Sequence, residues 1–403
     1  TVAALMATSV ALISVSAPLQ KRASALGFWA ASVAIGFALG PLIGGTLTDV
    51  ISWRSIFLLD LAILSVAGFL CFRVNRLGLV PHQPDAGKRI DFAGIAFLFV
   101  TLASFLYGLT SGQLFGWGAP QTLLLFGLAI AGGIGFVIRE IHAAEPLVAL
   151  GFFRHLDYTA ATICMFLNGA TQMGVLYFTN LFLQSPTGLN LSASQAGAAL
   201  LPFTLAMFVV SLLLPRLIVV GRYRIPVAAG MLTLAVGFWL LHGIDHQTPY
   251  SDIWWRLAIL GVGLGFNWAL LPRLGLGALP DAHAGQGSGV LNTTMFAGLA
   301  TGTALGGVVS SRIKRDIIDP VVDAVAASVP DLGALKVTLE HGSPSKIQGA
   351  LAKIPQTDVG KLEAAMRGAF DSGYSGVMIM MMLMSMAGVL IGAVLIRPER
   401  PAP

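Results

Sequence analysis

Long apolar stretches separated by short polar segments dominate this chain. Each stretch has about 17 to 26 residues, which is long enough for an α-helix to cross a hydrocarbon core of roughly 30 Å. The pattern predicts an all-α, polytopic membrane protein. We expect eleven spans, at residues 1–17, 25–47, 55–73, 92–111, 119–139, 159–183, 194–219, 225–243, 253–272, 286–309 and 374–396.

The composition agrees with a membrane protein and narrows the class of function. Apolar residues make up 56% of the chain and charged residues only 11%, against roughly a quarter in soluble domains. Cys71 and Cys164 both lie inside apolar spans, so neither a disulfide framework nor a thiolate metal site is indicated. No nucleotide-binding loop or catalytic set stands out. We expect no enzyme activity, no cofactor and no nucleic-acid partner.

The basic residues of the loops predict the orientation. Fourteen Lys and Arg residues lie in alternate loops and at the C-terminus, whereas the opposite short loops hold only Arg54 and Arg256. Cytoplasmic loops are enriched in Lys and Arg, so we expect the C-terminus to be cytoplasmic. The external segment 310–372 also contains basic residues, but the rule loses force for a segment of this length.

A stripe of small residues occurs twice, in the second and tenth spans. Gly36, Gly40 and Gly44 are spaced four apart, which places them on one helix face. A shift of 262 residues brings them onto Gly298, Gly302 and Gly306. Such stripes allow close helix packing in lipid, and their recurrence predicts an internal duplication. We expect the two stripes to form the sliding interface between the two halves, and the predicted interface residues are Gly36, Gly40, Pro41, Gly44, Gly45, Gly298, Gly302, Gly306 and Gly307.

The external segment and the end of the eighth span carry further polar residues. Pro320, Pro330, Pro344 and Pro355 are expected to divide the external segment, leaving an amphipathic helix at 357–371. The segment is interpreted as a cap or tether, with docking of a partner as the alternative. The residues His242, Asp245 and His246 have metal-like spacing, but they lie at an outer helix end and no metal is expected there.

Two adjacent motifs resemble a known family. Residues 27–45, GFWAASVAIGFALGPLIGG, resemble the antiporter motif in the fifth helix of major facilitator superfamily exporters. The stretch from Trp53 to Asp60 resembles the WRWIFxxN signature of the fourteen-span drug:proton antiporters of the EmrB/QacA type, with Asp60 and Ala62 where that family usually has Asn and Pro.

The resemblance implies a major facilitator fold with two pseudo-symmetric helix bundles. About 11 of 14 spans are then expected in the chain, with the family's first three helices upstream of Thr1. Residues 1–73 would belong to the first bundle, 74–158 to two inserted spans with cytoplasmic loops, and 159–403 to a six-span second bundle that includes the external loop 310–372.

Within this framework a few polar residues are candidates for transport chemistry. Asp60 lies inside a predicted span. An ionisable side chain is energetically costly there, so it usually marks an ion or proton pathway, and a carboxyl can take up and release a proton. The alternative is that Asp60 is a partner for Arg54 or an interfacial residue. A mostly apolar cavity with a few polar contacts is the second candidate, and interhelical hydrogen bonding is its alternative. Its predicted residues are Asn168, Thr171, Gln172, Asn267, Trp268, Asn292 and Thr293.

The expected function is secondary active export by proton-coupled antiport of hydrophobic or amphipathic drugs, through alternating access. The expected location is the bacterial inner membrane, and the partners are a small-molecule substrate, protons, the lipid bilayer and, at the external segment, a periplasmic adaptor protein. Two alternatives remain open. One is export of a dedicated metabolite, siderophore or lipid, and the other is a truncated, transport-inactive scaffold or sensor.

Overall fold

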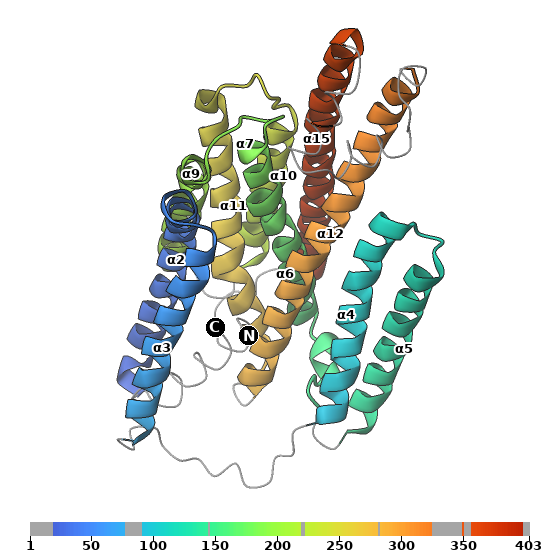
Figure 1. The fold of residues 1–403 in the computed structure, drawn as a ribbon. Helices are drawn as coiled ribbons and strands as arrows, with labels where there is room; N and C mark the ends of the chain where they lie inside the picture. The colour runs from blue at the N-terminus through green and yellow to red at the C-terminus, as the bar shows by residue number, and fades with distance from the viewer. Residues whose placement is uncertain are drawn as a thin grey trace.

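A computed structural model describes residues 19–76, 91–143, 146–218, 222–280, 283–324, 349 and 356–397 (Figure 1). Every secondary-structure element in these ranges is helical, which confirms the all-α prediction. The predicted span 1–17 lies outside the described residues.

The first four described helices form two antiparallel hairpins. One hairpin consists of α2 (Leu19–Val50) and α3 (Arg54–Arg76), and the other of α4 (Phe92–Phe115) and α5 (Pro120–His142). Gly116, which has a φ of 94°, ends α4 and allows the chain to turn into α5. Figure 1 shows the two hairpins on opposite sides of the remaining helices.

The remaining helices form a six-helix bundle, which we call the second bundle. Its first span contains a π-helical turn, a form that often occurs at functional sites. After the short η1 (Leu150–Arg154), the bundle contains α6 (Leu156–Met173) with η2 (Gly174–Thr179) and α7 (Asn180–Gln184), α8 (Ala193–Ala199) with α9 (Leu201–Leu217), α10 (Arg224–His242), α11 (Tyr250–Gly277), α12 (Ala284–Ala324) and α15 (Gln356–Leu395).

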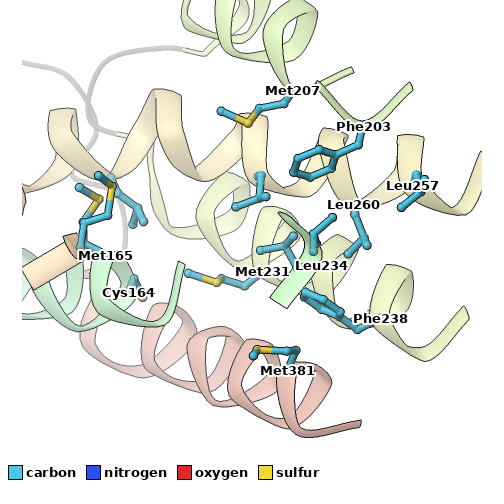
Figure 2. Packing of buried hydrophobic residues seen from close by; sticks show 14 of the residues in the cluster. Cys164, Met165, Phe203, Met207, Met231, Leu234, Phe238, Leu257, Leu260 and Met381 are labelled. Atoms are coloured by element: carbon cyan, nitrogen blue, oxygen red, sulfur yellow. The ribbon is translucent and has the colours of Figure 1, made fainter. Parts of the chain in front are cut away.

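The centre of the second bundle is a closely packed apolar core. Phe203 and Phe238 are buried among leucine side chains, and methionines from five helices belong to the same buried cluster (Figure 2). Methionine is flexible and polarizable, so it fits irregular gaps between helices. The methionine-rich last span contributes Met378 and Met381 to this core.

Seven helices among the described residues are long and apolar enough to cross a membrane. They are α3, α4, α5, α8 with α9, α10, α11 and α15. The other predicted spans in this part of the chain correspond to α2, α6 with α7, and α12, which run alongside the seven (Figure 1).

The helices alternate in direction, so that each end of the molecule has its own set of residues. We call the end that carries Arg76, Arg139, Arg154, Arg224 and Arg397 the basic end. The other is called the opposite end, where α2 meets α3 and where α8 and α11 begin.

Two helices extend further than the sequence pattern predicts. The predicted spans 286–309 and 374–396 correspond to α12, which continues to Ala324, and α15, which already begins at Gln356. The predicted break at Pro320 is wrong, because α12 continues through this residue. The predicted helix 357–371 is confirmed as helical, but it is continuous with the last span.

Apolar contacts explain why the two extensions stay helical. Ile318 and Val322 of α12 are buried, as are Leu362 and Ala369 of α15, and the two helices pack along each other. This packing offsets the backbone hydrogen bond that Pro320 removes from its helix. The paired helices project beyond the rest of the bundle at the opposite end (Figure 1).

Candidate functional site

Pro41 and Gly45, which lie beside the glycine stripe of α2, contact the beginning of α8 in the second bundle, whereas a Cβ added to Gly44 would meet only Ile56 of α3, at 3.9 Å. A Cβ atom added to Gly45 would lie 2.2 Å from the carbonyl oxygen of Ala193, and one added to Gly197 would lie 2.3 Å from that of Pro41. Backbone therefore meets backbone, and only glycine fits at either position. Further along α2, a Cβ on Gly36 or Gly40 would have no heavy atom within 4 Å in the described structure.

Asp49 bridges the same two helices with hydrogen bonds. Its carboxylate accepts the backbone N–H of Ala193 at 3.2 Å and that of Ser194 at 2.7 Å. The hydroxyl and the backbone N–H of Ser194 lower the pKa of Asp49 to about 2, with a smaller contribution from the Ser192 side chain. Asp49 therefore stays ionised at neutral pH, and we call this pair of hydrogen bonds the Asp49 bridge.

The sequence pattern does not indicate the contact between Asp49 and the start of α8. Ser192 and Gln195 form a capping box, in which the Ser192 hydroxyl accepts the Gln195 N–H and the Gln195 side chain accepts the Ser192 N–H. The S-x-x-Q spacing predicts a helix start at this point. Nothing in the sequence pairs that helix start with Asp49, which is 144 residues away from Ala193.

The second glycine stripe packs inside the second bundle. A Cβ on Gly298 would lie 2.0 Å from the carbonyl oxygen of Phe166, and one on Gly302 would lie 2.3 Å from that of Ala170. Gly306 faces the ring of Phe178, and Gly307 is half-buried. The expectation that this stripe lies between the two halves therefore needs correction: the spacing predicts close packing, and the partner is α6 of the same bundle.

The buried polar residues of α6 meet α11 at one point. Asn168, Thr171 and Gln172 are all fully or almost fully buried. The Gln172 side-chain oxygen accepts the indole N–H of Trp268 at 3.3 Å, which joins two of the predicted cavity residues. Thr171 donates its hydroxyl hydrogen bond within its own helix, to Leu167.

Two asparagine side chains are buried without hydrogen-bond partners among the described residues. Both polar atoms of Asn168 on α6 and of Asn267 on α11 are enclosed and unpaired. A buried polar group without a partner costs about 1–3 kcal/mol, and most such groups in proteins are satisfied. These two amides therefore have hydrogen-bonding capacity that the described residues do not use.

The α12 members of the predicted cavity set do not join this group. Asn292 donates to the carbonyl and hydroxyl oxygens of Ser288, one turn earlier in the same helix. Thr293 beside it is half-buried. The structure therefore brings Gln172 and Trp268 together and leaves Asn292 bonded within its own helix.

Asp60 and Arg54 lie on α3 and are both exposed in the described structure. Arg54 places its guanidinium 4.6 Å from the centre of the Trp53 ring and forms no ion pair with Asp60. Asp60 is the single acidic residue of α3, six positions after Arg54. Its role in proton exchange stays a prediction.

A second ionic group holds the α4–α5 hairpin together at the basic end. The nearly buried carboxylate of Asp91 accepts the N–H of Gly94 at 3.0 Å and the Arg139 Nε at 3.0 and 3.1 Å. The Gly94 N–H and then the Arg139 guanidinium lower the pKa of Asp91. Gln286 of α12 donates to the carbonyl oxygen of Pro146, which follows this hairpin.

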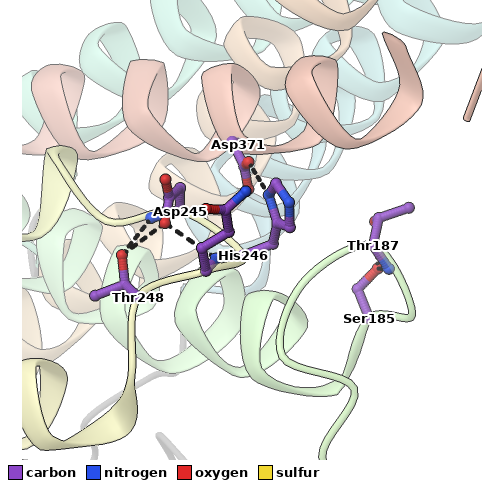
Figure 3. A network of polar contacts seen from close by, with 7 residues as sticks. Ser185, Thr187, Asp245, His246, Thr248 and Asp371 are labelled. Carbon is purple, nitrogen blue, oxygen red and sulfur yellow. Dashed lines mark hydrogen bonds and ion pairs between the residues drawn. The ribbon is translucent and has the colours of Figure 1, made fainter. Parts of the chain in front are cut away.

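The histidines with metal-like spacing do not converge. Figure 3 shows His246 turned towards Asp371 of α15, and Asp245 bonded to Thr248 in its own loop. The distance between His246 Nδ1 and Asp371 Oδ2 is 2.7 Å, and Asp245 also accepts the backbone N–H of Gln247. His242 contacts the carbonyl oxygen of Trp239 instead. In the described ranges, no three His, Cys, Asp or Glu side chains are arranged to hold a metal ion.

Comparisons with known proteins agree with this architecture. The model of the Major Facilitator Superfamily matches residues 1–303. The multidrug resistance protein Stp of Mycobacterium tuberculosis is 31% identical over 348 residues, which cover 81% of this chain and 62% of that protein. The tetracenomycin C resistance and export protein of Streptomyces glaucescens is 28% identical over 375 residues, covering 91% of this chain and 67% of that protein.

A longer alignment and a solved structure extend the likeness. The multidrug efflux pump LfrA of Mycolicibacterium smegmatis is 25% identical over 401 residues, or 98% of this chain and 76% of that protein. The structure of a bacterial homolog to the human lysosomal transporter Spinster matches with a TM-score of 0.52 and 15% identity, covering 96% of this chain and 72% of that one. The chain spans less than two thirds of the length of Stp. Since the family model matches well over half of its residues, the chain belongs to the Major Facilitator Superfamily.

Proposed function

We propose that the chain is part of a fourteen-span drug:proton antiporter of the EmrB/QacA type. It would export hydrophobic or amphipathic compounds by alternating access, with protons moving in the other direction. The observation that carries this proposal is the contact between α2 and α8, where backbone meets backbone at Gly45 and Gly197. Alternating access needs two bodies that meet closely at one end and can separate there.

The proposed substrate contacts are the buried polar groups between α6 and α11. Asn168 and Asn267 have unused hydrogen-bonding groups, and Gln172 and Trp268 form a polar pair in an otherwise apolar bundle. A few polar groups within apolar surroundings suit amphipathic compounds, which need orientation more than many hydrogen bonds. The relatives named as multidrug proteins support a broad substrate range.

Asp60 is the proposed proton-exchanging carboxylate of the described residues. It lies about 9 Å along α3 from Arg54, at 1.5 Å per residue, and α3 is one of the apolar helices able to span a membrane. Ionisable groups at such positions usually belong to an ion or proton pathway.

The transport proposal is tested in inside-out membrane vesicles that contain the full-length protein. A pH gradient is imposed and followed with a fluorescent dye, and a panel of amphipathic cations and antibiotics is added. A substrate should dissipate the gradient with the wild type. We expect Asp60→Asn to abolish this response and Asp60→Glu to keep it. No response to any compound would contradict drug:proton antiport, and a full response in Asp60→Asn would move proton coupling to another residue.

Export of one dedicated compound is a second candidate function. The tetracenomycin C resistance and export protein and the cephamycin export protein CmcT of Amycolatopsis lactamdurans are relatives whose names specify a single antibiotic. In the same vesicles, a response to one chemical class and to none of the others would favour this candidate.

A further inference from the structure

We propose that the Asp49 bridge controls how readily the two bundles separate at the opposite end of the molecule. This inference rests on the proposed alternating-access function and adds a positioning residue to it. The bridge joins the last turn of α2 to the first residues of α8, so it spans the contact across which the bundles would separate.

The geometry gives the carboxylate a role that the glycines cannot fill. The contacts at Gly45 and Gly197 bring two backbones together. Such van der Waals contacts are short-range and, unlike hydrogen bonds, do not join specific polar atoms. Each oxygen of Asp49 accepts one backbone N–H at the start of α8, where helix N–H groups lack partners within the helix. Separation of α2 from α8 breaks both hydrogen bonds at once.

The bridge is suited to change the balance between two states without carrying the transported proton. Asp49 is exposed, so water replaces its hydrogen-bond partners when the bundles separate. The contribution of the bridge to the equilibrium between the joined and separated states therefore stays modest. Its ionised form is the one that accepts both N–H groups. Asp60, the proposed proton site, lies on the neighbouring helix α3, so the two carboxylates have separable roles.

The test measures the separation directly, with spin labels in a full-length background that lacks Cys71 and Cys164. One label replaces Leu58, an exposed residue at the start of α3, and the other replaces Gln247 in the exposed loop before α11. Pulsed electron–electron distance measurements in lipid nanodiscs, without substrate, report the fractions of short and long distances. The same samples are heated to obtain their thermal unfolding midpoints.

We expect Asp49→Ala to raise the ratio of long to short distances by about fivefold, which is the change in an equilibrium constant that loss of a typical helix N-cap produces. Asp49→Asn keeps one acceptor oxygen of the same shape and should give a smaller shift. The matched control is Asp252→Asn, since Asp252 is also exposed at this end and its carboxylate has no hydrogen bond in the described structure. This control should leave the distances unchanged.

A variant of the donor residue tests whether Asp49 acts through its hydrogen bonds to α8 or in another way. Ala193 is the first residue of α8, where proline is tolerated, and Ala193→Pro removes the N–H that donates to Asp49. It should shift the distances in the same direction with Asp49 present and have no further effect in Asp49→Ala. A lowered unfolding midpoint with unchanged distances would overturn the proposal, as would an equal shift in Asp252→Asn. Neither result depends on substrate or protons, so failure here leaves the vesicle test of antiport standing.

Discussion

At the residue scale, Gly298 and Gly302 of α12 are sharply constrained by the backbone of α6. A Cβ on Gly298 or Gly302 would meet backbone carbonyl oxygens of α6, which cannot rotate away, so one of the helices must move. We expect Gly298→Ala and Gly302→Ala each to destabilise the protein by about 2 kcal/mol or more. The measurement is the thermal unfolding midpoint of the purified full-length protein.

Gly289 provides the control within the same helix. A Cβ at this position would have no heavy atom within 4 Å, so Gly289→Ala should be neutral or stabilise by up to about 1 kcal/mol through helix propensity. Equal losses at Gly289 and Gly298 would show that the stripe acts through backbone flexibility and not through the close contact with α6.

Asn168 allows a prediction that separates stability from transport. Its fully buried amide has no partner in the described structure, so Asn168→Leu, which has a similar size, removes an unsatisfied polar group. We expect the variant to be more stable, by about 1–3 kcal/mol, and to respond to fewer substrates in the vesicle assay.

Thr171→Val is the control for this experiment, because the Thr171 hydroxyl bonds only within α6 and should matter little to transport. A less stable Asn168→Leu protein would mean that the amide has a structural partner, such as a bound water. Full transport of every substrate would instead remove Asn168 from the proposed site.

Comparison of these residues shows what the sequence can specify. The spacing of Gly298, Gly302 and Gly306 places the three residues on one helix face, because local periodicity determines that face, and Gly298 and Gly302 lie against the backbone of α6. It does not specify the partner, which depends on how distant helices are arranged. The same limit hides the Asp49 bridge, whose two sides are ordinary helix-end residues until the fold brings them together.

At the element scale, the helix centres were predictable and the helix ends were less so. Long apolar runs give the spans directly, since a bilayer leaves few alternatives to a helix. Outside the apolar region that constraint vanishes, and the continuation of α12 through Pro320 depends on packing against α15. The alternation of span direction also follows from the sequence, because short loops connect most of these helices.

The α4–α5 hairpin gives a pH prediction at this scale. The hydrogen bond from Gly94 and the Arg139 guanidinium favour the ionised form of Asp91 in the folded protein and lower its pKa below the usual 3.8. A carboxyl with a lowered pKa stabilises the fold above its unfolded-state pKa, and this stabilisation is lost as the pH falls through the folded-state value. The start of α4 should therefore open on acidification below about 3.8.

Hydrogen–deuterium exchange of the peptide after Asp91 is the suitable measurement. After correction for intrinsic rates, protection of this peptide should be higher at pH 5 than at pH 3. Asp91→Asn should show a loss of about fivefold already at pH 5. Asp157→Asn is the control. Asp157 accepts a hydrogen bond from the Arg397 N–H at the same end of the molecule but outside this hairpin, so this variant should leave the protection of the peptide unchanged. Wild-type protection of this peptide at pH 5 in Asp91→Asn would show that the ion pair between Asp91 and Arg139 is not needed to keep the start of α4 closed.

At the scale of the whole molecule, the two hairpins have different relations to the second bundle. The α2–α3 hairpin contacts α8 through Gly45, Gly197 and the Asp49 bridge, and α2 also contacts α9. The α4–α5 hairpin contacts α12, and Gln286 bonds to Pro146 in the segment that follows it. In addition, Phe152 packs against both Tyr158 and His283, which joins this connection to α6 and to the residue before α12.

These contacts predict that the α4–α5 hairpin moves with the second bundle during transport, whereas the α2–α3 hairpin moves against it. Labels at Gln121, the exposed second residue of α5, and at Gln247 should therefore give one distance in every state. The pair at Leu58 and Gln247 should change its distance distribution when substrate or a pH gradient is supplied. If the α4–α5 hairpin moved separately, the Gln121–Gln247 pair would also show a second distance, and Gln286→Ala would increase the population of that second distance. An invariant first pair together with a changing second pair would place the moving boundary between α2–α3 and the rest of the described helices.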